Sequence, residues 1–393
     1  MENKEETVLE KPSYEHFLEV RDLRTSFFIP AGEVKSVDGS NFNVDKGKIL
    51  GIVGESGSGK SVTAYSLMQI LSSPGKIVGG SVKIEGKELI GLPENELAKI
   101  RGGKISIIFQ DPMTSLNPVY SIGNQLREAI MLHRRKTVAC KVKQVSVDEN
   151  GKKVVTYVDS TKEVKLSRAE ANARAIEMLQ LVGINSPEKR LKQYPFEFSG
   201  GMLQRIMIAM ALCCEPDLLI ADEPTTALDV TIQAQILDLI QDIQKKMGMA
   251  VILITHDLGV VAELCDEVIV MYGVKIVERG TADEIFYNPK HEYTKGLLRS
   301  IPTNDNKGER LVPISGNAID LLNLPEGCAF CPRCPHAMKI CLKQYPDEMV
   351  VNDMHKCSCF MYAKELYDKG ELELANSSDT LENVDKEVST DAE

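Results

Sequence analysis

Four short runs of apolar residues, each bounded by glycine or polar residues, are spaced along the chain. Because these runs are continuous rather than alternating, they are typical of strands that are buried on both faces of a parallel sheet. Stretches that favour helices or loops separate them, and one helix is expected to begin at the capping box Ser167–Glu170. The pattern therefore predicts an α/β fold with a parallel-sheet core and a helical insertion. The four strands are expected at residues 49–53, 105–109, 218–221 and 251–254.

Composition places the chain among globular proteins. Its 393 residues correspond to two or three domains, and 43% of them are hydrophobic. We expect no membrane span, since no apolar run approaches the ~18 residues that one needs. We also expect no signal peptide, because the first eleven residues are mostly charged. The net charge of −11 argues against a dedicated binder of duplex DNA, which usually carries a basic surface.

Charge is distributed unevenly. Residues 364–393 contain ten acidic and three basic residues, which is typical of a disordered and solvated tail. Residues 133–168 have the opposite bias, with ten basic and four acidic residues. Within them, Asn150-Gly151 lies between two valine-containing runs, a pattern that predicts a β-hairpin. We interpret this segment as a surface insertion, either simply solvated or in contact with anionic lipid headgroups.

A glycine-rich segment directly follows the first apolar run. Residues 54–61 match the phosphate-binding pattern G-x-x-x-x-G-K-[ST] in full, between a predicted strand and a predicted helix. The glycines let backbone N–H groups surround phosphate oxygens, and the helix N-terminus adds positive potential. Lys60 is expected to reach the β- and γ-phosphates, and the Ser61 hydroxyl is expected to bind Mg²⁺. The nucleotide-binding residues predicted here are Gly54, Ser56, Gly57, Ser58, Gly59, Lys60, Ser61 and Val62.

A pair of carboxylates ends another apolar run. Asp222 and Glu223 follow residues 218–221, at the strand end where α/β proteins bind ligands. Asp222 is expected to hold Mg²⁺ through water, and Glu223 is expected to orient and polarise the attacking water. Alone, two such carboxylates are equally compatible with ordinary solvated charges. Together with the phosphate loop they indicate nucleotide hydrolysis.

Between these two elements, residues 198–205 read Phe-Ser-Gly-Gly-Met-Leu-Gln-Arg. Ser199 can cap a following helix, and Gly200 and Gly201 permit close backbone approach. This segment resembles the signature sequence of ATP-binding-cassette (ABC) ATPases. The resemblance implies that it contacts the γ-phosphate of ATP held by an opposite cassette, so that two cassettes close around two nucleotides. Met202 stands where the family usually has glutamine, which puts a side-chain contact in doubt but not the backbone contact.

Other residues match the family in the expected order. Gln110 resembles the Q-loop glutamine that reaches Mg²⁺, and Asp229 lies in a segment that resembles the D-loop. His256 resembles the switch histidine that contacts the γ-phosphate. Phe27 stands where the family places an aromatic ring that stacks on adenine, with Phe28 as its rival and core packing as the alternative.

The resemblance covers about residues 17–302. It implies the fold of a P-loop NTPase: an ABC-type RecA-like core with a parallel sheet, an antiparallel β subdomain and a helical subdomain. We expect an N-terminal tail, a nucleotide-binding domain, a family-specific extension with a cysteine cluster, and an acidic disordered tail. These parts correspond to residues 1–16, 17–290 (helical subdomain about 111–198, charged insertion about 137–165), 291–362 and 363–393.

Three further segments are similar to the ATPases of oligopeptide/dipeptide and nickel permeases: residues 110–118, 288–302 and the cysteine-bearing 327–341. This similarity implies an ATP- and Mg²⁺-dependent ATPase, peripheral on the cytoplasmic face of the cell membrane, that powers import of oligopeptides or dipeptides. Residues 111–118 are then candidates for part of the surface that docks the permease. Import of nickel or another small solute is an alternative. A soluble ABC ATPase acting on nucleic acid or ribosomes is a weaker one, because the chain has one cassette and no sustained heptads.

The same similarity implies the partners. They are a second ATPase subunit, expected to be a related but different chain, two transmembrane permease subunits, and an extracellular substrate-binding protein that acts through the permease. No nucleic-acid partner is expected.

Six of the ten cysteines fall between Cys328 and Cys359. The resemblance implies a [4Fe–4S] cluster held by four of them, with Cys331 as a substitute ligand. Zn²⁺ is an alternative, since tetrahedral sites of four cysteines are common, and a segment without metal is another. The four predicted ligands are Cys328, Cys334, Cys341 and Cys357.

Overall fold

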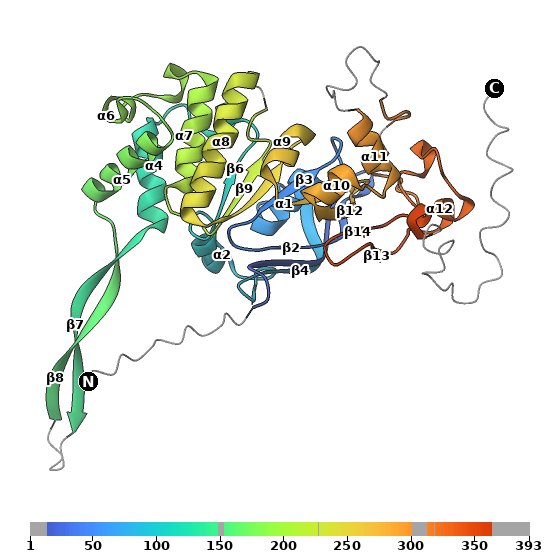
Figure 1. The fold of residues 1–393 in the computed structure, drawn as a ribbon. Helices are drawn as coiled ribbons and strands as arrows, with labels where there is room; N and C mark the ends of the chain where they lie inside the picture. The colour runs from blue at the N-terminus through green and yellow to red at the C-terminus, as the bar shows by residue number, and fades with distance from the viewer. Residues whose placement is uncertain (1–13, 148–152, 227, 301–312, 318, 364–393) are drawn as a thin grey trace, which may run out of the picture. The chain divides into compact units, whose positions relative to one another are not determined.

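The computed structural model describes residues 14–147, 153–226, 228–300, 313–317 and 319–363 (Figure 1). The chain divides into two compact units. The first unit comprises residues 1–92 and 248–393, and the second comprises residues 93–247. Across the described ranges, no helix combines the length and apolarity that a membrane crossing requires.

The larger sheet of the first unit contains strands in the order β13-β14-β12-β11-β3-β10. β3 runs parallel to both β10 and β11, with Ile49 opposite Val251. Every residue of β3 and β10 is buried, which explains their uninterrupted apolar sequences and confirms the two strands predicted here. The bounds are β3 (Ile49–Val53), β10 (Ala250–Ile254), β11 (Glu267–Tyr272), β12 (Lys275–Thr281), β13 (Met349–Val350) and β14 (Lys356–Cys357).

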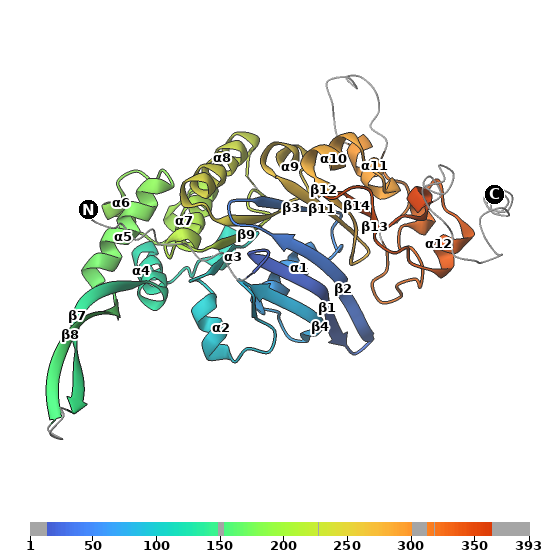
Figure 2. The same cartoon turned by 60° about the horizontal axis from the view of Figure 1, so that its bottom comes forward.

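A second sheet of the first unit is antiparallel and has the strand order β2-β1-β4-β5 (Figure 2). β1 pairs along its length with β2, from Leu18 opposite Val44 to Ile29 opposite Gly32. β4 pairs with the other edge of β1. The antiparallel sheet implied by the family resemblance is therefore present. The bounds are β1 (Leu18–Ile29), β2 (Gly32–Val44), β4 (Gly75–Ile84) and β5 (Lys87–Glu88).

Some helices of the first unit begin at polar caps. Asp257 caps α9 by accepting hydrogen bonds from two backbone N–H groups, and Thr281 with Glu284 forms a capping box on α10. These caps fix where the loops after the strands end. The bounds are α1 (Lys60–Met68), α9 (Leu258–Leu264), α10 (Ala282–Tyr287), α11 (Glu292–Arg299), the 3-10 helix η2 (Cys331–Arg333) and α12 (Lys339–Lys343).

The second unit pairs the parallel strands β6 (Ile105–Ile108) and β9 (Leu218–Asp222). The strand predicted at 105–109 thus ends one residue early, and the one predicted at 218–221 extends to Asp222. Helix α5 begins at Ser167 with the predicted capping box. The helices are α2 (Glu94–Ile100), α3 (Pro112–Ser115), α4 (Ile122–His133), α5 (Arg168–Leu181), α6 (Pro187–Arg190), the 3-10 helix η1 (Pro195–Glu197), α7 (Gly200–Leu212) and α8 (Val230–Met247).

An antiparallel ribbon leaves the helices of the second unit between α4 and α5 (Figure 1). β7 (Arg135–Val147) pairs with β8 (Lys153–Lys165) without a break in register. This ladder confirms the pairing that the valine-containing runs predicted. The turn at Asn150-Gly151 lies outside the described residues.

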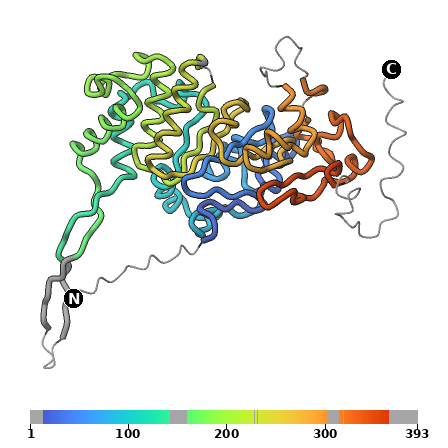
Figure 3. Tube along the Cα trace, viewed as in Figure 1, coloured from blue at the N-terminus to red at the C-terminus, as the bar shows by residue number. Residues whose placement is uncertain are grey.

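The C-terminal extension belongs to the first unit and forms the orange-to-red part of the trace after α10 (Figure 3). Its last strand, β14, pairs antiparallel with β12, with Cys357 opposite Glu278. The extension therefore adds two short strands to the edge of the larger sheet. The predicted acidic tail, apart from its first residue, and residues 1–13 lie outside the described residues.

Candidate functional site

The glycine-rich segment forms the loop that joins β3 to α1 in the first unit. Gly54, Gly57 and Gly59 all have positive φ angles, of 151°, 79° and 101°. A Cβ at Gly54 would lie 2.2 Å from the backbone oxygen of Met271, and one at Gly59 would lie 2.3 Å from that of Ser36. Because backbone atoms surround the loop this closely, no larger residue fits at either position.

Lys60 begins helix α1 and is 6% exposed. Its Nζ donates to the backbone oxygens of Gly54, at 2.7 Å, and Glu55, at 2.9 Å. The ammonium group is therefore held inside the loop. Ser61 is the next residue of the helix, whose N-terminal N–H groups favour an anion.

The carboxylates at the end of β9 lie in the second unit. Asp222 is fully buried, whereas Glu223 is partly exposed and has a φ of 46°, which a non-glycine residue seldom adopts. Gln110 Nε2 donates to Glu223 Oε2 at 2.9 Å, and Thr226 Oγ1 donates to the same oxygen at 2.9 Å. The structure thus brings together Gln110 and Glu223, which are 113 residues apart.

The signature segment forms the start of α7, with Ser199 at the N-cap position as predicted. In the described part of the chain, however, its hydroxyl accepts no capping hydrogen bond from the first turn, so that detail of the prediction is wrong. Ser199 is exposed, and water can satisfy the N–H groups of the first turn instead. Gly200 is exposed and Met202 partly exposed, so the start of α7 is accessible to a ligand.

Two residues that were not singled out from the sequence hold this helix in place. Gln204 is buried, and its side-chain amide donates to the backbone oxygen of Pro224, next to Glu223. Arg205 donates to the backbone oxygen of Val182 at 2.8 Å. They lie three and four residues after Gly201, and their contacts lie about 20 residues away in sequence, so no local pattern indicates these contacts.

The remaining predicted polar residues lie on loops. Asp229, in the second unit, directly precedes α8 and accepts from the backbone N–H of Ile232 at 3.0 Å, so it caps the start of that helix. His256, in the first unit, is exposed on the loop between β10 and α9. Ala227 of the predicted D-loop lies outside the described residues.

The two candidate aromatic residues lie near the end of β1 and differ in exposure. Phe27 is partly buried, and a Cβ at Gly75 would lie 2.8 Å from its ring. Phe28 is 46% exposed, with the Lys76 ammonium 5.9 Å from its ring centroid. Neighbouring residues therefore cover much of the Phe27 side chain, whereas the Phe28 side chain is more exposed to solvent.

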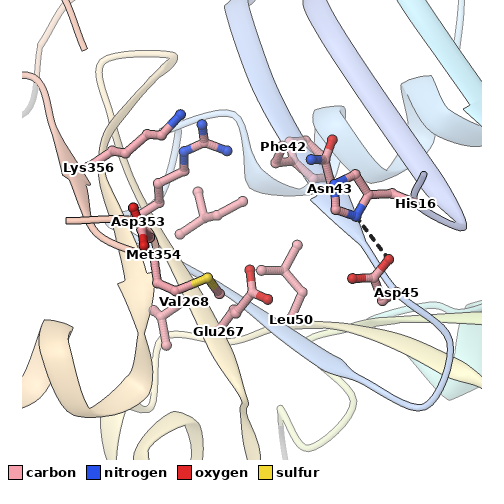
Figure 4. Close-up of a pocket in the computed structure, with 12 residues that line it drawn as sticks. His16, Phe42, Asn43, Asp45, Leu50, Glu267, Val268, Asp353, Met354 and Lys356 are labelled. Atoms are coloured by element: carbon pink, nitrogen blue, oxygen red, sulfur yellow. Dashed lines mark hydrogen bonds and ion pairs between the residues drawn. The ribbon is translucent and has the colours of Figure 1, made fainter. Parts of the chain in front are cut away.

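The first unit also contains a cavity of about 280 Å³ whose lining includes none of the predicted site residues (Figure 4). Its lining includes His16, whose Nδ1 lies 3.0 Å from Asp45 Oδ1, together with Glu267 and Lys356. None of the twelve lining residues in Figure 4 is a predicted nucleotide-site residue.

The six clustered cysteines lie in the extension, and all ten cysteines of the chain, which are among the described residues, are free thiols. Burial raises the pKa of Cys328 and of Cys334 to about 12, and it raises the pKa of Cys357 well above its usual value. Metals bind the thiolate form. Within the described ranges, no three Cys, His, Asp or Glu side chains are placed so that they could hold a metal ion. The predicted [4Fe–4S] or Zn²⁺ site does not fit this arrangement.

Comparison with known proteins extends these observations. Residues 37–226 match the family described as ABC transporter, and residues 277–341 match the family described as oligopeptide/dipeptide transporter, C-terminal region. The chain is 48% identical over 349 residues to the oligopeptide transport ATP-binding protein OppD of Escherichia coli (strain K12), covering 89% of this chain and 94% of that protein. It is also 48% identical over 348 residues to the dipeptide transport ATP-binding protein DppD of Bacillus subtilis (strain 168), covering 88% and 95%.

Among solved structures, the dimeric ATP-binding cassette MJ0796 bound to ADP and Pi is similar with a TM-score of 0.55 and 23% identity. The match covers 67% of this chain and 98% of that one, and it supports the fold. One family match includes the phosphate loop, and the other includes much of the extension. The two relatives are 48% identical to this chain over most of their length, so the family assignment is secure. The chain belongs to the family of ABC transporter ATP-binding proteins, in its oligopeptide/dipeptide branch.

Proposed function

We propose that this protein is the ATP-hydrolysing subunit of an importer for oligopeptides or dipeptides. The relatives named above, with the matching C-terminal region, support the substrate class. The hydrogen bond from Gln110 to Glu223 is the observation that supports ATP hydrolysis, because it orients a carboxylate at the end of a buried strand, next to Asp222. ATP and water are the substrates, and ADP and phosphate are the products.

Phosphate binding is assigned to the loop and to the start of α1. Backbone N–H groups of residues 54–62 donate to the phosphate oxygens. Lys60 exchanges its two backbone acceptors for the β- and γ-phosphates. This exchange needs little movement, since the ammonium group is already held inside the loop that the phosphates would fill.

Oxygen donors suit Mg²⁺, and the residues assigned to it offer the hydroxyl of Ser61, the carboxylate of Asp222 and the amide oxygen of Gln110. The chemistry of these donors fits the ion. When bound, Mg²⁺ neutralises charge on the β- and γ-phosphates. Asp222 is fully buried, so it offers a fixed carboxylate rather than a mobile one.

Glu223 is the proposed general base. Its carboxylate is fixed by Gln110 and Thr226, which both donate to Oε2, and it accepts a proton from the water that attacks the γ-phosphate. His256 is the proposed contact to the γ-phosphate. Phe27, or the more exposed Phe28, stacks on adenine.

Ser199, Gly200, Gly201 and Met202 are assigned to ATP held by a second cassette, and Asp229 is assigned to the D-loop. The accessible start of α7 supports this assignment. The Ser199 hydroxyl then serves the nucleotide rather than its own helix. Two cassettes would close around two ATP molecules, and closure would drive the permease subunits.

Gly200 permits a test that separates this role from folding. A Cβ there would meet no heavy atom of the described chain within 4 Å, and an aspartate in the first turn of a helix is favourable. We therefore expect Gly200→Asp to leave the unfolding temperature unchanged. The added negative charge would face the phosphate of the opposing nucleotide, and ATPase activity of the assembled complex should fall by about tenfold or more.

Thermal unfolding and steady-state ATPase assays check both parts, with Gly248→Asp as the matched control. Gly248 follows α8 and likewise has space for a Cβ, although its φ of 64° adds strain there. A Gly200→Asp protein with full ATPase activity would remove the signature segment from the site.

The proposed partners are a second, related cassette, two transmembrane permease subunits and an extracellular substrate-binding protein. The protein itself would be peripheral on the cytoplasmic face of the cell membrane. Residues 111–118 are the proposed docking surface, and Met113 is 63% exposed there. Purification of a tagged chain from detergent-solubilised membranes should recover the two permease subunits, and recovery of ribosomes or nucleic acid instead would contradict the proposal.

A metal site held by the clustered cysteines is a separate proposal, and the arrangement of the described residues does not support it. The ligands proposed from the family resemblance are Cys328, Cys334, Cys341 and Cys357, with Cys331 as substitute, for [4Fe–4S] or Zn²⁺. No step of hydrolysis depends on them. Quantification of iron, sulfide and zinc after anaerobic purification tests this proposal.

A further inference from the structure

One residue of the phosphate loop, Glu55, is held at three points, two of them by residues that are far in sequence from β3 and α1, which flank the loop. Glu55 N–H donates to Tyr293 Oη at 2.8 Å, and its backbone oxygen accepts from Lys60. The Glu55 carboxylate pairs with Arg333, whose two terminal nitrogens lie 2.7 and 3.0 Å from its two oxygens. All these residues belong to the first unit.

The arginine is itself rigidly placed. Arg333 lies in η2, between Cys331 and Cys334, and its side chain is only 6% exposed. It donates to the backbone oxygens of Ser315, at 2.9 Å, and Ile314, at 3.2 Å. A guanidinium fixed this way presents a planar fork that matches a carboxylate in both distance and direction.

Aromatic rings connect the arginine to the other anchor of Glu55. The rings of Tyr272, Tyr293 and Phe330 lie within 4.6 to 5.4 Å of one another, centroid to centroid. The Arg333 guanidinium lies 5.7 Å from the ring of Tyr272. Tyr293 is fully buried. The two side chains that hold Glu55 are therefore packed together through Phe330 of the extension and Tyr272 of β11.

We propose that Arg333 is a positioning residue for ATP binding, through which the C-terminal extension sets the conformation of the phosphate loop. Its fork fixes the Glu55 carboxylate, and Tyr293 fixes the Glu55 backbone. Because the neighbouring N–H groups of the loop are the phosphate donors, the position of Glu55 determines how well they converge. A displaced loop weakens ATP binding more than it slows the chemical step, which depends on Glu223.

The test is a double-mutant cycle with the full chain in its complex, since the inference rests on the ATPase function. Arg333→Met keeps the apolar stem on the aromatic rings but removes the fork. We expect KM for ATP to rise about tenfold, or about 1.4 kcal/mol, while kcat at saturating ATP changes less than about threefold. In a Glu55→Gln background, the same substitution should change KM by less than about twofold. Arg333→Lys should give partial rescue.

Arg279→Met is the matched control. Arg279 pairs with Glu348 at 2.9 Å and so also joins the extension to the larger sheet, away from the loop. The Arg279→Met substitution should leave KM for ATP unchanged. Equal effects of Arg333→Met and Arg279→Met, or an undiminished effect of Arg333→Met in the Glu55→Gln background, would overturn the proposal, because either would indicate general loosening of the extension.

Binding of a fluorescent ATP analogue separates this inference from the proposed function. If the wild-type chain binds the analogue and the cycle shows no coupling between positions 55 and 333, only the positioning role is overturned. If the coupling appears and the complex transports no peptide, the positioning role stands and the proposed substrate fails. A wild-type chain that does not bind the analogue overturns both.

Discussion

Replacement of Glu223 by glutamine should reduce kcat for ATP by about a hundredfold or more and leave ATP binding intact. Glutamine has almost the same shape and can still accept a hydrogen bond, but its amide cannot accept the proton of the attacking water. General-base catalysis contributes about 10²- to 10⁴-fold in rate. The donors Gln110 and Thr226 already fix the side chain of Glu223, so the loss should appear in the chemical step rather than in folding.

Steady-state turnover and binding of a fluorescent ATP analogue measure the two effects separately. Glu215→Gln is the matched control, because Glu215 lies shortly before the same strand β9 and pairs with Arg134 and Arg174. It makes the same chemical change at a surface ion pair, and turnover should be unaffected. Substantial hydrolysis by the Glu223→Gln protein would show that another group accepts the proton.

Replacement of Lys60 by alanine should weaken ATP binding by about 30-fold or more. The Lys60 ammonium group is nearly buried and is the charge that would meet the β- and γ-phosphates. Truncation of one partner of a buried charged pair costs about 2–5 kcal/mol, which corresponds to about 30-fold or more in affinity. Because Lys60 also donates to Gly54 and Glu55, the empty loop should become less ordered as well.

Equilibrium binding of the ATP analogue checks this prediction. Lys48→Ala provides the control, since Lys48 lies just before β3 and its half-exposed side chain pairs with Asp266 at 2.9 Å. It should bind ATP like the wild type. Near-normal affinity in the Lys60→Ala protein would place the phosphates somewhere other than this loop.

The sequence was most informative where local pattern and burial agree. The apolar runs at 49–53 and 251–254 form strands in which every residue is buried, and the Ser167–Glu170 capping box begins α5. Gly54 and Gly59 carry the strictest backbone requirements, as the phosphate-loop pattern implies. Such features depend on residues close together in the chain, so a single sequence contains the information that specifies them.

Features that depend on distant residues were not predictable in the same way. Glu55 and Arg333 are 278 residues apart, and neither stands out in its own segment. The strands β13 and β14 have two residues each, too few to produce a periodic pattern. Ser199 occupies the predicted N-cap position without the predicted hydrogen bond, because residue type fixes a preference but not the direction of an exposed hydroxyl.

The most direct test of the central claim is peptide uptake by the reconstituted complex. Proteoliposomes would contain the permease subunits, the partner cassette and this chain, with the substrate-binding protein and a labelled tripeptide on the opposite side and ATP with Mg²⁺ on the cassette side. We predict uptake that requires ATP hydrolysis and is lost with Glu223→Gln but retained with Glu215→Gln. Uptake that persists unchanged with Glu223→Gln would contradict the claim that hydrolysis by this chain powers peptide import.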